Sequence, residues 1–181
     1  MRKWCCRICG HDEYAETFDK NYLCMGCSIV FASPSKFNLS TIKFKKLHED
    51  AILPTKGTDA SVGHDLYALE DCLVTNRSTA FIPTGLSVEL PPNVEMQIRM
   101  RSGLGKKGLM LPNGVGTIDP DYRGQIMMMM VNAYDIPFQI KKGDRVAQGL
   151  FTTKLPYELE EVFEISETDR GAGGFGSTGT K

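Results

Sequence analysis

The sequence lacks any apolar run near the length of about 20 residues that a membrane-spanning helix needs. Its first residues, MRKWCC, also lack the apolar stretch of a secretory signal. Long stretches of amphipathic helical periodicity are missing too. We therefore expect a cytoplasmic protein with no membrane partner.

Neither positive nor negative charge is in clear excess. The chain has 181 residues, with 21 Lys and Arg against 22 Asp and Glu and a net charge of −1 at pH 7. The overall balance therefore indicates neither a nucleic-acid partner nor a membrane surface. Histidine is scarce, and neither His48 nor His64 lies at a metal-ligand spacing. This length suits one ordinary domain with a small additional module.

Cysteine is nearly absent beyond residue 27, because five of the six cysteines lie within residues 5–27. In a reducing compartment such clustering favours metal ligation over disulfides. Two Cys-x₂-Cys pairs are separated by 14 residues, close to the spacing of four-cysteine zinc sites. The predicted structural Zn²⁺ ligands are Cys6, Cys9, Cys24 and Cys27. Cys5 is an alternative to Cys6.

We predict a zinc-ribbon-like module over residues 1–31, followed by a linker over residues 32–41. A segment of about 30 residues has little core, so metal binding would supply its folding free energy. The alternative is a metal-free, disordered leader. Trp4 and nearby basic residues favour nucleic-acid contact, whereas the acidic residues between Asp12 and Asp19 oppose it. Nucleic acid and protein both stay open as the partner of this module.

From residue 42 onward the sequence has the pattern of strands and turns. Apolar residues alternate with polar ones over residues 86–90 and 94–101, with the turn Pro91-Pro92-Asn93 between them. The run 126–131 (IMMMMV) is apolar at every position. A strand there must be covered on both faces, by a second sheet or by a neighbouring subunit.

The last residues form the glycine-rich segment RGAGGFGSTGTK. Its glycines disfavour a core element, because they cost conformational entropy and bury no side chains. A disordered tail is one interpretation. Arg170 and Phe175 among the glycines favour another, a flexible lid over residues 166–181 that closes on an aromatic, anionic ligand.

Five segments resemble, in order, the five motifs of the trimeric dUTPase family. They are Gly63–Ala68 (GHDLYA), Arg101–Leu104 (RSGL), Asn113–Gly124 (NGVGTIDPDYRG), Gly143–Gln148 (GDRVAQ) and Arg170–Gly179 (RGAGGFGSTG). The resemblance implies a mainly β protein whose residues 42–165 form a dUTPase-like distorted jelly-roll β-barrel. It also implies hydrolysis of dUTP to dUMP and pyrophosphate.

The first, second and fourth motifs carry the groups that the resemblance assigns to the phosphates. Asp65 would hold the waters of a Mg²⁺ that bridges the phosphates, since magnesium keeps most of its waters. A guanidinium, a hydroxyl and free backbone N–H groups suit anionic oxygens. The expected phosphate-binding residues are Arg101, Ser102, Gly103 and Gln148.

The third motif carries the groups expected at the base, the sugar and the attacking water. By resemblance, Asn113 and Gly116 line the uracil pocket, and Tyr122 packs on the deoxyribose and leaves no room for a 2′-hydroxyl. Asp119 orients and deprotonates the water, a role worth about 10²–10⁴-fold in rate. Asp121 and Arg123 are expected to be structural, paired with each other or with a neighbouring subunit.

The tail supplies the remaining expected contacts. The resemblance assigns the γ-phosphate to Arg170, uracil stacking to Phe175, and further donors to Gly176, Ser177 and Thr178. In the family this tail closes over the active site of a different subunit, so a homotrimer with shared sites is expected.

Two other functions stay open. One is a regulatory or binding protein that keeps the dUTPase fold and acts through the zinc module. The other is a dCTP deaminase of the same fold, which the IDPDY and GFGST segments disfavour because they match the hydrolase.

Overall fold

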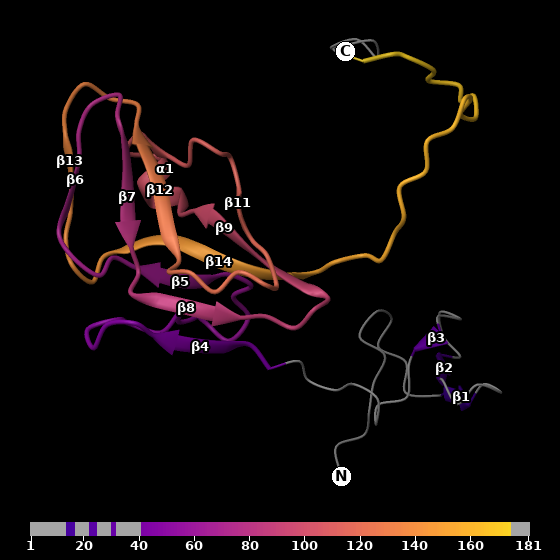
Figure 1. Cartoon of the computed structure of the whole chain (residues 1–181), viewed down its shortest axis with the longest axis horizontal. Helices are drawn as coiled ribbons and strands as arrows, with labels where there is room; N and C mark the ends of the chain where they lie inside the picture. The colour runs from indigo at the N-terminus through magenta and orange to yellow at the C-terminus, as the bar shows by residue number, and fades with distance from the viewer. Residues whose placement is uncertain (1–13, 17–21, 25–29, 32–40, 175–181) are drawn as a thin grey trace.

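The computed structural model describes residues 14–16, 22–24, 30–31 and 41–174, with side chains from residue 41 (Figure 1). The first 40 residues contain three short described strands, β1 (Tyr14–Glu16), β2 (Tyr22–Cys24) and β3 (Val30–Phe31). These strands pair antiparallel in the order β1-β2-β3. Within the described ranges, no helix has the length and apolarity to span a membrane.

From residue 41 the protein is built from strands and turns, which confirms the mainly β prediction (Figure 1). One helical turn, α1 (Ser102–Gly105), interrupts them. The strands are β4 (Lys43–Lys46), β5 (His64–Tyr67), β6 (Cys72–Val74), β7 (Thr79–Pro83), β8 (Leu86–Glu89), β9 (Val94–Met100), β10 (Leu109–Met110), β11 (Gly116–Ile118), β12 (Met127–Asn132), β13 (Phe138–Ile140) and β14 (Arg145–Thr153).

A four-stranded antiparallel sheet in the order β11-β9-β14-β5 positions most of the candidate residues. The predicted alternation in β9 is present, since Val94, Met96 and Ile98 are buried. β14 pairs with β9 and β5, so that Gln148 lies opposite both Arg99 and Asp65. Other pairings are β10-β12-β7, β13-β6 and β4-β8.

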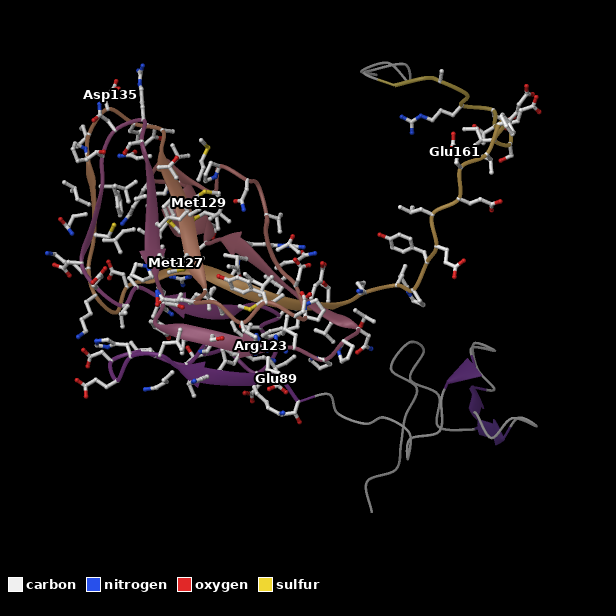
Figure 2. All side chains as sticks on the ribbon, in the orientation of Figure 1. Glu89, Arg123, Met127, Met129, Asp135 and Glu161 are labelled. Atoms are coloured by element: carbon white, nitrogen blue, oxygen red, sulfur yellow. The ribbon has the colours of Figure 1, made fainter. Side chains whose placement is uncertain are left out.

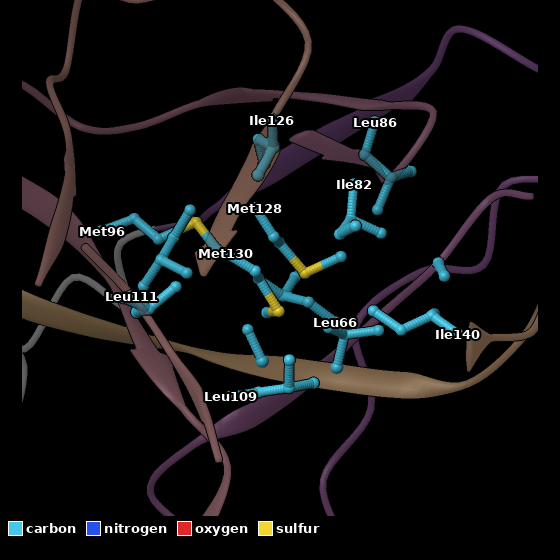
Figure 3. Close-up of a cluster of buried hydrophobic side chains, with 14 of the residues drawn as sticks. Leu66, Ile82, Leu86, Met96, Leu109, Leu111, Ile126, Met128, Met130 and Ile140 are labelled. Carbon is cyan, nitrogen blue, oxygen red and sulfur yellow. The ribbon is translucent and has the colours of Figure 1, made fainter. Parts of the chain in front are cut away.

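β12 has one face in the core and one face toward the outside. Ile126 before it and Met128 and Met130 within it are fully buried beside residues such as Leu66 (Figure 3). Met127 and Met129 alternate with them (Figure 2). Met127 is 37% exposed. The chain thus covers one face of the strand and leaves the other partly exposed.

Beyond β14 the chain runs in an extended path away from the sheets (Figure 1). We call residues 154–174 the C-terminal arm. Its large apolar side chains are exposed, Leu159 at 91% and Phe163 at 109%. The described part of this chain therefore leaves the apolar side chains of the arm uncovered.

Candidate functional site

Asp65 is held between two arginines. It lies in β5, and only 9% of its surface is exposed. Its Oδ1 is 2.9 Å from Arg101 Nε, and its Oδ2 is 3.3 Å from Arg145 Nη1. Arg101 Nη1 also donates to the Arg145 carbonyl at 3.1 Å. Two guanidiniums against one carboxylate leave a net positive charge, which suits an anionic ligand.

These groups line a cavity of about 430 Å³. Segments far apart in the sequence meet there because β5 and β14 are neighbours and Arg101 directly follows β9. The lining includes Gly63, Asp65, Arg101, Ser102, Arg145 and Gln148. The residues expected at the phosphates from three motifs thus converge, except that Gly103 lines the adjoining cavity of about 440 Å³, which shares Arg101 and Arg145.

Gly63 leaves room for Gln148. A Cβ at residue 63 would lie 3.0 Å from Gln148 Cδ and closer still to Oε1. Any side chain there would therefore push the amide group from its place in the cavity. Gln148 Nε2 also lies 3.5 Å from the Met100 carbonyl, at the limit of a hydrogen bond.

The third motif lies at the opposite edge of the sheet. Asp119 directly follows β11 and is exposed. β11 and β5 are three strand spacings apart, roughly 14 Å at about 4.8 Å per spacing. Asn113 and Tyr122 are exposed and Gly116 is half-buried, and none of the three lines the cavity around Asp65. The structure therefore does not bring the two groups together within one subunit.

The loop that carries Asp119 and Tyr122 is ordered by its own hydrogen bonds. Tyr122 N–H donates to the Asp119 carbonyl at 3.1 Å. The Arg123 guanidinium donates to the carbonyls of Pro120 at 2.7 Å and Tyr122 at 2.9 Å. Between residues 41 and 174 no ion pair joins Asp121 to Arg123, because the guanidinium is turned toward these carbonyls. The alternative, pairing with a neighbouring subunit, stays a prediction.

The expected tail residues are only partly described. Arg170 is exposed in the C-terminal arm, and its Nε donates to the Gly173 carbonyl at 2.9 Å. Phe175, Gly176, Ser177 and Thr178 lie outside the described residues. The same holds for Cys6, Cys9 and Cys27 and for the side chain of Cys24. The predicted lid contacts and zinc site stay predictions.

Two residues of this site were missed by the sequence reasoning. Arg145 and Gly63 stand inside the GDRVAQ and GHDLYA segments, so the motifs contained them. The sequence shows neither that Arg145 reaches Asp65 nor that Gln148 packs on Gly63. Both contacts cross from β14 to β5 or to the residue before it.

His64 precedes Asp65 in β5 and packs edge-on against Phe151, with ring centroids 5.4 Å apart. Its Nδ1 is buried and has no hydrogen-bond partner among the described residues. Burial lowers the pKa of His64 from its ordinary value of 6.5, and the positive charge of Lys56 lowers it further. We therefore expect a neutral imidazole beside the site.

Comparisons of sequence and structure relate this chain to known proteins. Residues 49–179 match the dUTPase family model. The deoxyuridine 5′-triphosphate nucleotidohydrolase of Nautilia profundicola is 44% identical over 139 residues, which are 76% of this chain and 98% of that protein. The Clostridium tetani protein of the same name is 46% identical over 140 residues, 77% of this chain and 97% of that protein. The Staphylococcus bacteriophage 80alpha dUTPase with dUPNHPP superposes with a TM-score of 0.72 and 26% identity, covering 77% of this chain and 98% of that one.

Proposed function

This chain belongs to the dUTPase family and is a dUTP diphosphatase, and we propose that it hydrolyses dUTP to dUMP and pyrophosphate with Asp119 activating the attacking water. The observation that carries the proposal is the convergence of Asp65, Arg101, Ser102 and Gln148 on one positively charged cavity. A triphosphate is the part of the substrate that this cavity suits. The relatives named nucleotidohydrolase favour this reaction over the deamination of dCTP.

In the proposed reaction, the oxygen of a water molecule bonds to the α-phosphorus while the bond to the bridging oxygen breaks. Pyrophosphate leaves with the electron pair, and the Asp119 carboxylate takes the proton of the water. Arg101, Arg145 and Ser102 stabilise the charge on the phosphate oxygens, because donors fixed in advance need no reorganisation during the step. Gly103 and Gln148 bind the same phosphate chain.

The third motif is proposed to read the nucleoside. Backbone groups around Asn113 and Gly116 satisfy the hydrogen-bonding edge of uracil, and cytosine would leave some of them unpaired. The Tyr122 ring packs on the deoxyribose and excludes a 2′-hydroxyl. The exposure of Asn113 and Tyr122 in the single subunit supports this role, because both side chains are free to meet a ligand.

Mg²⁺ is the proposed cofactor, with Asp65 holding it through water. A carboxylate has about four lone-pair positions; Arg145 donates to one of them on Oδ2 of Asp65, and Arg101 forms an ion pair with Oδ1. Positions remain to accept hydrogen bonds from metal-bound waters, which fits a magnesium ion bound mainly by waters and phosphates. When bound, this ion neutralises part of the triphosphate charge.

We propose that each active site is shared between subunits of a homotrimer. The strand order supports sharing, because Asp119 and Asp65 belong to opposite edges of one sheet, roughly 14 Å apart. The exposed arm supports it too, since it carries Arg170 away from its own sheets. Arg170, Phe175, Gly176, Ser177 and Thr178 are proposed to close over the site of another subunit.

The N-terminal residues are proposed to bind a structural Zn²⁺ through Cys6, Cys9, Cys24 and Cys27. The described strands support this, because β2 ends at Cys24, the first cysteine of the second pair, within an antiparallel three-stranded sheet. The module would then offer a surface to a nucleic-acid or protein partner.

Pyrophosphate release from dUTP by the purified protein tests the proposed function, with dCTP, dTTP and UTP as competing substrates. We expect turnover of dUTP alone and a loss of about 10²–10⁴-fold in kcat for Asp119→Asn. Asp121→Asn is the matched control, because it removes a second exposed carboxylate of the same loop. Binding of dUTP without turnover by the wild-type protein would overturn the proposal in favour of the regulatory function.

A further inference from the structure

Gly124 lies directly against the ring of Tyr122. The Tyr122 hydroxyl folds back over the chain and donates to the Gln125 carbonyl at 3.0 Å. A Cβ at residue 124 would lie 2.5 Å from Tyr122 Cζ and 3.0 Å from Cε2, and nearer still to the hydroxyl oxygen. Carbon atoms in contact stay about 3.5–4.0 Å apart. The ring therefore occupies the space that a side chain at residue 124 would need.

The backbone around this contact is fixed on several sides. The buried Ser87 hydroxyl donates to the Arg123 carbonyl at 2.8 Å. Ile126 N–H donates to the Leu86 carbonyl at 2.8 Å. These bonds attach the residues on both sides of Gly124 to β8. A methyl group at residue 124 would therefore displace the free end of the Tyr122 side chain more easily than the backbone.

We propose that Gly124 is a positioning residue that sets the sugar specificity of the enzyme through Tyr122. Because residue 124 has no side chain, the Tyr122 ring can occupy the space beside it, with its hydroxyl held by the Gln125 carbonyl. From that place the ring contacts a deoxyribose and excludes a 2′-hydroxyl. This inference rests on the proposed function, because it takes Tyr122 as the sugar contact.

Gly124→Ala should narrow the preference for dUTP over UTP. The ring must retreat by roughly 1 Å to reach an ordinary contact distance, and a misplacement of that size can cost about 100-fold in rate. The deoxynucleotide loses a close contact, whereas the ribonucleotide loses a steric barrier. We expect the ratio of kcat/KM for dUTP to that for UTP to fall about 10- to 100-fold.

The experiment measures kcat/KM for both nucleotides with the wild type, Gly124→Ala and Gly105→Ala. Gly105 is the matched control, because a Cβ there meets nothing nearer than 3.9 Å. The inference predicts a narrowed ratio for Gly124→Ala and an unchanged ratio and melting temperature for Gly105→Ala. An unchanged ratio, or an equal loss on both nucleotides, overturns it. If the wild-type protein does not turn over dUTP, that result overturns the proposed function instead.

A second variant carries the test if Gly124→Ala does not fold. Tyr122→Phe leaves the backbone unchanged and removes the hydrogen bond to the Gln125 carbonyl that holds the ring against Gly124. The ratio of kcat/KM values should again fall. A ratio equal to that of the wild type would show that the held position of the ring does not set specificity.

Discussion

At the scale of single residues, Asp65 departs most from what its motif suggests. The sequence presents it as one polar residue of a strand, available to a metal ion. In the fold, its Oδ1 is paired with the Arg101 guanidinium and its Oδ2 accepts from Arg145, so it also orients both arginines toward the cavity. Removing this carboxylate would therefore misplace two cations and also remove the proposed contact with magnesium.

His64 is the residue whose protonation should affect the stability of the fold. Because its folded pKa is lowered, the unfolded chain binds a proton more readily than the native chain. The contribution of neutral His64 to stability is therefore complete above pH 6.5, its ordinary pKa. This contribution is lost as pH falls from 6.5 toward the lowered pKa of the folded state. We expect the free energy of unfolding to decline below pH 6.5.

Denaturant unfolding at a series of pH values checks this for the wild type and His64→Gln. Glutamine cannot protonate, so His64→Gln should flatten the decline. A wild-type slope that persists in His64→Gln would assign the decline to other groups, such as the carboxylates.

At the scale of elements, β12 shows how much of a strand's burial its sequence pattern predicts. Its apolar run predicted cover on both faces, and the structure covers one of them. Full burial of one methionine side chain stabilises a fold by about 1.5–3 kcal/mol. Met128 and Met130 each contribute an energy of this size from the inner face of the strand. Phe81, paired with Met129 on the outer face, is 59% exposed. That face suits the subunit contacts of the proposed trimer.

The N-terminal cysteine pairs give a prediction at the same scale. The purified protein should contain about one zinc per chain, held by four thiolates. Cys24→Ser and Cys27→Ser should each lower the zinc content. Cys72→Ser should not lower it, because Cys72 lies in β6, outside the cysteine cluster of residues 5–27. Elemental analysis after dialysis measures the ratio. Equal zinc content in all of these proteins, or zinc in none of them, would count against the module.

At the scale of the whole molecule, the division of the site between two edges of one sheet has a direct consequence. If Asp119 of one subunit serves the cavity of another, two inactive variants should complement each other. Asp119→Asn and Gln148→Ala should each lose activity alone. In every trimer that contains both variants, about one site in three should combine the intact Asp119 of one chain with the intact Gln148 of another.

Co-expression with two different tags and purification through both of them supplies the mixed trimers. The control pairs Asp119→Asn with Asp119→Ala, which no exchange of subunits can complement. Recovery in the first mixture and none in the control would support a shared site. No recovery in either mixture would mean that each subunit uses its own Asp119.

The sequence by itself determined the mainly β class, the alternation of β9 and the family, because strand periodicity and motif order are local properties of the chain. The clamp on Asp65, the packing of Gln148 on Gly63 and the contact of Tyr122 with Gly124 depended on the tertiary structure. The first two join segments that are distant in sequence, and strand pairing alone decides which of these meet. The third depends on where a ring turns within a loop, which residue identity does not specify.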